Sequence, residues 1–291
     1  TALKLARKWG YTKRNPRIPR NEAKIIVCAN NFHGRTVTIV SFSSEEQYRD
    51  AFGPLTPGFT PIPFGDASAL QSAITPNTVA FLLEPIQGEG GIVVPLEGYL
   101  RECKQICEEN NALFIADEIQ TGLGRTGRKF ACDYEDVKPD LYILAKAISG
   151  GILPVSAVVG SDELIRVFEP GDHGSTFGGN PFACRMVLEA LSVLEDEGLV
   201  ERSMELGLYF KDALRSIGSP YVKEVRGKGL MIGVEFYPDG PDAHEFCMRL
   251  LREGIITKDT RQYVMRFTPP LTISREELDW ALERIERVLT R

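Results

Sequence analysis

Residues 111–122 read NALFIADEIQTG, and their pattern decides the class of fold. The apolar run 112–116 is too short for an isolated helix. It is preceded by two asparagines and followed by Asp117, and this pattern favours a buried strand. Similar apolar runs alternate with helical patterns along the first half of the chain, at 24–29, 78–83, 141–145 and 155–159. This alternation predicts an α/β fold in which helices cover both faces of a mostly parallel sheet.

The helical patterns lie between and after these strands, and the pattern changes near Gly218. Helices are expected near 44–52, 66–74, 97–110, 181–197 and 200–217. After Gly218 the sequence predicts strands at 229–236 and 263–268, a helix at 242–253 and a last helix after Ser274, with Glu277 completing a capping box. We therefore expect a large α/β domain at 1–217 and a smaller α+β domain at 218–291.

Composition excludes several classes of function. The 291 residues are 43% hydrophobic and 25% charged, and 34 basic against 40 acidic residues give a net charge of -6, so no positive field attracts nucleic acid. No apolar stretch is long enough for a membrane span, and no signal peptide is evident, so we expect a cytoplasmic protein with small-molecule partners and no membrane partner. The six cysteines are scattered, which supports neither a metal site nor a disulfide framework.

The first residues predict a helix that lacks its own start. The amphipathic run that contains Leu3, Leu5 and Trp9 resembles the middle of a helix, and no capping box precedes it. We therefore expect that the N-terminal part of the large domain is missing from this sequence.

Charged residues close three of the predicted strands. Asp117 follows 112–116, Lys146 follows 141–145, and Glu84 follows 78–83. Ligands of parallel sheets bind at the carboxyl ends of the strands, so these residues are candidates for a site. One alternative is a structural ion pair between Asp117 and Lys146. The other is that Lys146, partly buried and with a lowered pKa, forms a Schiff base with an aldehyde cofactor, while Asp117 stays ionised beside the pyridine nitrogen of that cofactor.

Five longer strings favour the second alternative. They are FHGRT at 32–36, LEPIQGEGG at 83–91, ADEIQTGLGRTGR at 116–128, AKAISGG at 145–151 and HGSTFGGNP at 173–181. In order and spacing the whole chain resembles the class III aminotransferases, which implies the type I fold of pyridoxal-phosphate-dependent transferases. Within that class, GSTFGGNP, EVRGKGLMIG at 224–233 and VMRFTPPL at 264–271 are most similar to the members that act on ornithine.

The resemblance assigns the cofactor-binding residues by position. Lys146 would hold pyridoxal 5'-phosphate covalently and carry the proton in catalysis, and Asp117 would contact the pyridine nitrogen. Gln120 would hydrogen-bond the phenolic oxygen of the ring, and Phe32 would stack on its face. Ser175 and Thr176 would reach the phosphate in the neighbouring subunit, which implies a homodimer with composite active sites.

The resemblance also assigns the substrate-binding residues. Arg35 would bind the α-carboxylate of ornithine, and Arg266 would bind 2-oxoglutarate. Glu89 would act as a gate by pairing with Arg266 until the second substrate displaces it, with Glu84 nearby. The implied reaction transfers the δ-amino group of ornithine to 2-oxoglutarate.

Three interpretations stay open beside this one. Another class III enzyme could act on acetylornithine or 4-aminobutyrate, since Arg35 does not distinguish these donors. A catalytically silent homologue could serve as a binding partner, although Lys146 and Asp117 are both present. His33 is interpreted as structural, because the sequence shows no partner for it.

Overall fold

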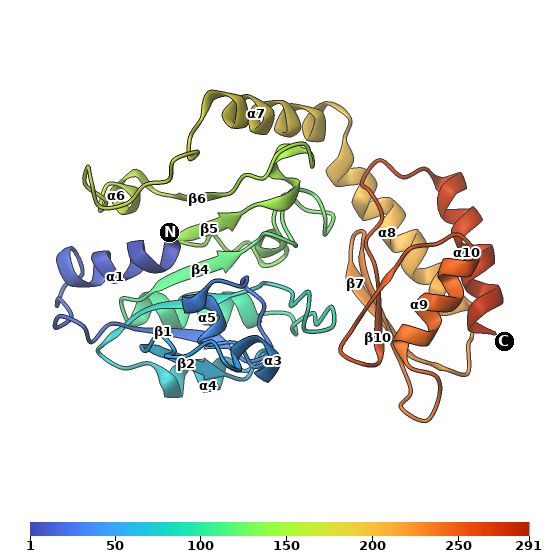
Figure 1. The fold of residues 1–291 in the computed structure, drawn as a ribbon, viewed down its shortest axis with the longest axis horizontal. Helices are drawn as coiled ribbons and strands as arrows, with labels where there is room; N and C mark the ends of the chain where they lie inside the picture. Colours follow the sequence, from blue (N-terminus) through green and yellow to red (C-terminus); the bar gives the residue numbers. More distant parts are fainter. Residues whose placement is uncertain (291) are drawn as a thin grey trace. The chain divides into compact units, whose positions relative to one another are not determined.

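The computed structural model describes residues 1–290 and separates into two compact units (Figure 1). Unit 1 comprises residues 1–85, 95–120 and 132–191, and unit 2 comprises 86–94, 121–131 and the residues from Ser192 onward. Within residues 1–290, no helix has both the length and the apolar character to cross a membrane.

A six-stranded sheet forms the centre of unit 1, in the order β2-β1-β3-β4-β5-β6. The first five strands in this order are parallel to their neighbours, and β6 pairs antiparallel with β5 at one edge. The strands are β1 (Lys24–Cys28), β2 (Phe59–Ile62), β3 (Thr78–Leu83), β4 (Leu113–Asp117), β5 (Leu141–Leu144) and β6 (Ala157–Gly160). The prediction of an α/β fold with a mostly parallel sheet is therefore confirmed.

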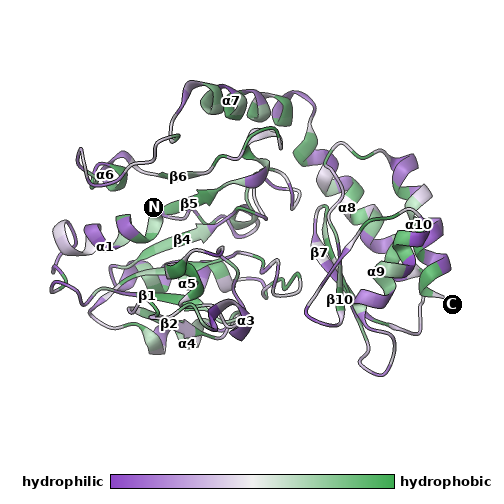
Figure 2. Cartoon of the chain, viewed as in Figure 1, coloured by the Kyte–Doolittle hydropathy of each residue, from purple (hydrophilic) through white to green (hydrophobic). Residues whose placement is uncertain are grey.

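Helices cover both faces of this sheet, because successive strand residues point to opposite sides. One set of side chains packs against α4 and α5, and the alternate set packs against α1. Figure 2 shows β4 and β5 in the colour of apolar residues, as expected for strands covered on both faces. The helical elements are α1 (Ala2–Thr12), α2 (Val37–Val40), α3 (Glu46–Arg49), α4 (Ala67–Ala73), α5 (Tyr99–Glu109), η1 (Ala131–Glu135), η2 (Lys146–Ser149), α6 (Asp162–Ile165) and α7 (Pro181–Asp196).

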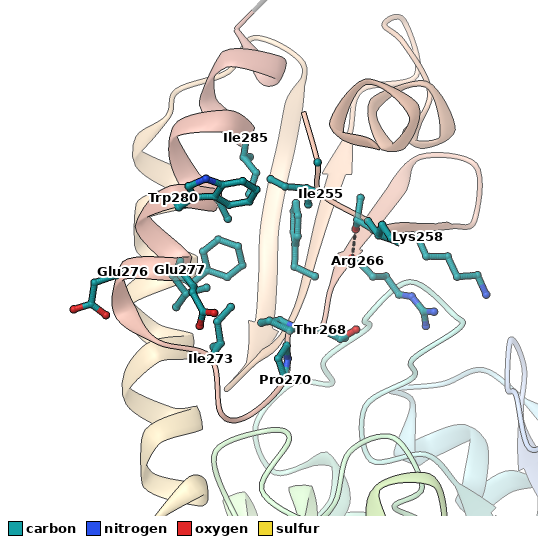
Figure 3. Close-up of a pocket in the computed structure, with 18 residues that line it drawn as sticks. Ile255, Lys258, Arg266, Thr268, Pro270, Ile273, Glu276, Glu277, Trp280 and Ile285 are labelled. Atoms are coloured by element: carbon teal, nitrogen blue, oxygen red, sulfur yellow. Dashed lines mark hydrogen bonds between the residues drawn. The ribbon is translucent and has the colours of Figure 1, made fainter. Parts of the chain in front are cut away.

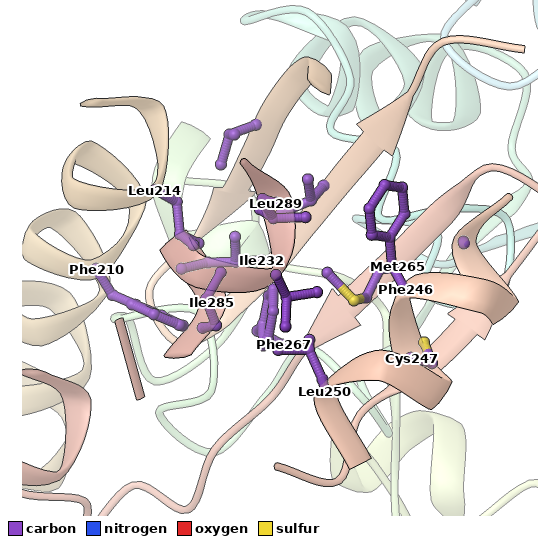
Figure 4. Close-up of a cluster of buried hydrophobic side chains, with 14 of the residues drawn as sticks. Phe210, Leu214, Ile232, Phe246, Cys247, Leu250, Met265, Phe267, Ile285 and Leu289 are labelled. Atoms are coloured by element: carbon purple, nitrogen blue, oxygen red, sulfur yellow. The ribbon is translucent and has the colours of Figure 1, made fainter. Parts of the chain in front are cut away.

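Unit 2 contains a four-stranded antiparallel sheet in the order β7-β8-β10-β9, packed against three helices. Phe210, Ile232, Phe246 and Phe267 belong to four different elements and meet in one buried cluster (Figure 4). The predicted capping box of Ser274 and Glu277 is present at the start of α10. The elements are α8 (Leu199–Ser216), β7 (Val222–Lys228), β8 (Met231–Phe236), α9 (Ala243–Arg252), β9 (Lys258–Thr260), β10 (Val264–Phe267) and α10 (Arg275–Leu289).

The division between the units differs from the predicted boundary after residue 217. Helix α8 ends close to that position, but Leu206, Phe210 and Leu214 bury their side chains in the core of unit 2. Two loops of the first half also belong to unit 2, since Ile92 and Ala131 pack with Met231. A boundary drawn from a change of pattern cannot detect such tertiary packing.

Candidate active site

Three neighbouring parallel strands bring the candidate residues of unit 1 to one edge of the sheet. Ala116 lies opposite Leu83 in β3, and Asp117 lies opposite Ile143 in β5. Glu84 directly follows β3, Asp117 is the last residue of β4, and Lys146 lies two residues beyond β5. The structure therefore places all three at the carboxyl edge, where open parallel sheets bind their ligands.

Asp117 is buried, with 5% of its side chain exposed, and both of its carboxylate oxygens accept hydrogen bonds. The ring nitrogen Nδ1 of His33 lies 2.6 Å from Oδ2, and the backbone N–H of Ile119 donates to Oδ1 at 3.1 Å. Within residues 1–290 these are its partners, so the ion pair with Lys146 is not formed. The sequence shows no partner for His33, and the structure supplies one in Asp117, which lies 84 positions away along the chain.

His33 is enclosed by two carboxylates. Its side chain is 2% exposed. Burial alone would lower the pKa of the His33 imidazole, but the hydrogen bond and charge of Asp117, together with the charge of Glu84, raise it above its ordinary value. The second ring nitrogen, Nε2, is buried and has no hydrogen-bond partner within residues 1–290.

Lys146 begins the short helix η2 in an unusual backbone conformation. Its φ angle is 51°, in the left-handed region that costs a residue with a side chain on the order of 1 kcal/mol. The side chain is exposed, in contrast to the partial burial that the sequence predicted. The turn places Lys146 at the start of η2, two residues beyond the end of β5.

Glu84 fixes the loop that carries Phe32. It is 4% exposed, and its Oε2 accepts the backbone N–H of Phe32 at 3.0 Å. The guanidinium of Arg35 lies 3.6 Å from the ring centroid of Tyr48 and 5.6 Å from that of Phe32. Such cation–π contacts orient the arginine plane. The sequence did not identify Tyr48, since its contact with Arg35 depends on how the loop folds back.

The remaining candidates of unit 1 lie nearer the surface. Gln120 is half-buried, and Ser175 and Thr176 are exposed in the loop before α7. The residues just before this loop bind α1: the Lys4 ammonium donates to the backbone oxygen of Asp172 at 2.8 Å, and His173 Nε2 lies 2.8 Å from the hydroxyl of Thr1.

The two candidates of unit 2 form an ion pair. Arg266 Nη1 lies 2.7 Å from Glu89 Oε1, and 12% of the arginine side chain and 22% of the glutamate side chain are exposed. Lys258 in β9 lies opposite Arg266 in β10, with its Nζ 3.5 Å from Glu89 Oε2. Like charges on facing strands repel each other, so Glu89 offsets the repulsion between the two cations. Lys258 was not identified from the sequence, because β9 was not predicted.

An apolar pocket of about 950 Å³ lies beside this ion pair, within unit 2. Ile255, Trp280 and Ile285 contribute to its lining, and Figure 3 shows Lys258 and Arg266 extending away from them. The Arg266 Nε atom is buried without a partner in the described part of the chain. A guanidinium can bind a carboxylate through two of its N–H groups, and here the carboxylate that contacts Arg266 is that of Glu89.

The residues of unit 1 fit an aldehyde cofactor with a pyridine ring. Such a cofactor requires an amine for its aldehyde and a carboxylate for its ring nitrogen. Lys146 and Asp117 supply these groups at the ends of adjacent strands, and two N–H donors already hold the Asp117 carboxylate.

The chain belongs to the class III aminotransferases, because the family model described as "Aminotransferase class-III" matches residues 1–289. It is accordingly a transaminase that depends on pyridoxal 5'-phosphate. Among curated relatives, the ornithine aminotransferase of Bacillus subtilis is 57% identical and that of Brevibacillus brevis 55% identical. Each alignment covers 99% of this chain and 71% of the relative.

Solved structures of similar fold are also aminotransferases. The ornithine aminotransferase of Toxoplasma gondii ME49 is 48% identical, with a TM-score of 0.96 over 99% of this chain and 69% of that chain. An acetylornithine aminotransferase from Elizabethkingia anophelis is 42% identical, with a TM-score of 0.86 over 99% of this chain and 70% of that chain.

Proposed function

We propose that the protein transfers the δ-amino group of ornithine to 2-oxoglutarate, giving glutamate 5-semialdehyde and glutamate. The ion pair of Glu89 and Arg266 carries this proposal. An enzyme that takes ornithine by its δ-amine must prevent the α-amino acid end from binding where the α-carboxylate of 2-oxoglutarate binds. A paired Arg266 does this, because an incoming carboxylate must first displace Glu89. The names of the relatives at 57% and 55% identity support the same donor.

When bound, pyridoxal phosphate supplies the electron sink and carries the amino group between the two half reactions. Lys146 would hold the cofactor through its amine and would move a proton at the reacting carbon of the substrate. Asp117 would keep a proton on the pyridine nitrogen. Phe32 would pack on the face of the ring, and Gln120 would donate a hydrogen bond to its phenolic oxygen.

Two arginines handle the two substrates. Arg35, whose guanidinium lies over the ring of Tyr48, binds the α-carboxylate of ornithine through charge-assisted hydrogen bonds. Arg266 binds the α-carboxylate of 2-oxoglutarate after Glu89 moves away. Lys258 remains as a second cation for the displaced Glu89 carboxylate, since it already lies 3.5 Å from it. Glu84 contributes indirectly by holding the Phe32 backbone.

The active protein is a homodimer with composite sites, in which Ser175 and Thr176 bind the cofactor phosphate of the other subunit. Large apolar side chains near Ser175 and Thr176 are exposed, which supports the proposal that a second subunit covers this surface. Phe177 is 80% exposed, and Phe182 and Leu188 in α7 are each 60% exposed. An exposed apolar patch of this kind is typical of an interface between protein chains. Hydroxyl groups beside glycines suit a phosphate.

A comparison of amino donors tests the proposed substrate. Specificity constants for ornithine, acetylornithine and 4-aminobutyrate, each with 2-oxoglutarate as acceptor, are measured on the same preparation. We expect ornithine to be preferred by at least about tenfold, because acetylation removes the α-ammonium and 4-aminobutyrate lacks the α-amino acid end. A preference for acetylornithine or 4-aminobutyrate would assign the protein to another member of the class.

A further inference from the structure

Glu89 is held at its backbone as well as at its carboxylate. The hydroxyl of Thr260, the last residue of β9, donates to the backbone oxygen of Glu89, with Oγ1 2.5 Å from that oxygen. Thr260 is buried, with 7% of the residue exposed. This hydrogen bond therefore restrains the same residue whose side chain pairs with Arg266.

One face of β9 supplies two of the contacts to Glu89. Successive residues of a strand point to opposite sides, so Lys258 and Thr260, two positions apart, lie on the same face. The Lys258 ammonium lies 3.5 Å from Glu89 Oε2, and Thr260 binds the backbone of the same glutamate. Lys258 lies opposite Arg266 in the neighbouring strand β10. Arg266, Lys258 and Thr260 therefore reach Glu89 from two paired strands.

The loop beyond Glu89 is attached separately. Arg226 in β7 donates to the backbone oxygen of Gly91 through Nε at 3.1 Å and through Nη2 at 2.7 Å. The same Nε lies 3.1 Å from the backbone oxygen of Ile92, whose side chain is fully buried. These contacts fix the chain two and three residues after Glu89. The hydrogen bond of Thr260 acts instead on the residue that carries the carboxylate.

We propose that Thr260 is a positioning residue for substrate selectivity, which anchors the Glu89 backbone so that the glutamate side chain alone moves between Arg266 and Lys258. This inference rests on the proposed function, in which Glu89 keeps the α-amino acid end of ornithine away from Arg266. A hydrogen bond to the backbone oxygen leaves the side-chain torsions of Glu89 free, so the carboxylate can leave Arg266 and return to it without movement of the loop. Loss of the anchor leaves Glu89 paired for less of the time and admits other carboxylates to Arg266.

Two pairs of proteins differ only in the hydroxyl of residue 260. Wild type is compared with Thr260→Val, in which a methyl group replaces the hydroxyl, and Thr260→Ser is compared with Thr260→Ala. Glu89→Ala is the reference for loss of the gate. Ser219→Ala is the matched control, because the Ser219 hydroxyl also donates to a backbone oxygen of unit 2, that of Leu289 at 2.6 Å.

Two quantities are measured on the holoenzyme. The ratio of reaction at the α-amine of ornithine to reaction at the δ-amine reports selectivity. Calorimetric binding of glutarate, a dicarboxylate without a reactive carbonyl, reports access to Arg266 without turnover. Thr260→Val and Thr260→Ala should each raise the ratio and tighten glutarate binding by about threefold, which lies within the range of one hydrogen bond. Thr260→Ser and Ser219→Ala should stay close to wild type in both measurements.

Each other outcome has a defined meaning. If Glu89→Ala changes both quantities while Thr260→Val and Thr260→Ala match wild type, Thr260 does not position the gate and the proposed function stands. A shift in Thr260→Ser as large as that in Thr260→Ala would also overturn the inference, because packing rather than the hydroxyl would then be responsible. An equal shift in Ser219→Ala would overturn it as well, since general loosening of unit 2 would explain the effect.

The reference variant separates this inference from the proposed function. If Glu89→Ala changes neither quantity, the proposed gate fails together with the inference. Should Thr260→Val not retain the cofactor, the comparison of Thr260→Ser with Thr260→Ala decides alone.

Discussion

At the scale of single residues, the site depends on two groups that close neighbouring strands. Asp117 and Lys146 could be selected from the sequence, because a charged residue directly after an apolar run is costly without a partner or a task. The contact of His33 with Asp117 could not be selected, since a pair 84 positions apart forms only when β1 and β4 enter the same sheet. Tyr48 was missed because its contact with Arg35 depends on how the loop after β1 folds back. Residues on strand ends are therefore predictable, and the side chains that restrain them are much less so.

Lys146 is predicted to be the lysine that carries the cofactor. Reduction of the holoenzyme with borohydride, followed by peptide mass spectrometry, should place a phosphopyridoxyl group on Lys146. Lys146→Ala should lose this covalent link and the yellow colour but unfold at nearly the same urea concentration as wild type, because the side chain is exposed. A modified peptide that contains any other lysine would refute the assignment.

Glu89 is predicted to control which amino group of ornithine reacts. Glu89→Ala leaves Arg266 without its carboxylate partner at 2.7 Å and beside the like charge of Lys258. Reaction at the α-amine should then rise by about tenfold relative to reaction at the δ-amine, the scale of one differential ionic contact. Product analysis by mass spectrometry measures the ratio.

Glu224→Ala is the matched control for this substitution. Glu224 also pairs with an arginine of unit 2, at 2.8 Å from Arg226, but its side chain is 53% exposed. Regiochemistry should be unchanged in this control. An unchanged ratio of α- to δ-amine reaction in Glu89→Ala would show that the Glu89–Arg266 pair does not control which amino group reacts.

At the scale of elements, the buried strands were predicted well, whereas the edge strands β2, β7 and β9 were missed and only the edge strand β6 was predicted, at 155–159. β3 and β4 are buried along their whole length and appear in the sequence as continuous apolar runs. β2 contains Pro61, which an edge strand tolerates, and β7 is rich in charged residues, so neither has that signal. The expected helix at 44–52 is reduced to the single turn α3.

A close approach of backbones joins α8 to the turn between β7 and β8. A Cβ added at Gly207 would lie 2.1 Å from the backbone oxygen of Gly229, which no side-chain movement can relieve. Gly207→Ala should therefore lower the free energy of unfolding by roughly 1–3 kcal/mol, although alanine is the better helix former.

Urea unfolding measures this effect. Glu205→Ala, at an exposed position two residues earlier in α8, is the control and should change the midpoint little. A Gly207→Ala protein as stable as that control would show that α8 can shift away from Gly229.

At the scale of the whole molecule, composite sites predict complementation between two inactive variants. One variant carries Lys146→Ala, and the other carries Ser175→Ala with Thr176→Val. If the hydroxyl groups serve the neighbouring subunit, a mixed dimer regains one intact site, which combines Lys146 of one chain with Ser175 and Thr176 of the other. Activity should therefore reappear when the variants are unfolded and refolded together. No recovery, although mixed dimers are detected by mass, would place these hydroxyl groups at the site of their own chain.

The transfer of nitrogen from ornithine shows directly which of its two amino groups reacts. Ornithine labelled with ¹⁵N at either the δ- or the α-position is incubated with 2-oxoglutarate and the holoenzyme, and the glutamate formed is examined by mass spectrometry. We expect the δ-label to appear in glutamate and the α-label to stay in the other product. Glutamate labelled mainly from the α-position would contradict the proposed orientation of ornithine and the role of the Glu89–Arg266 pair.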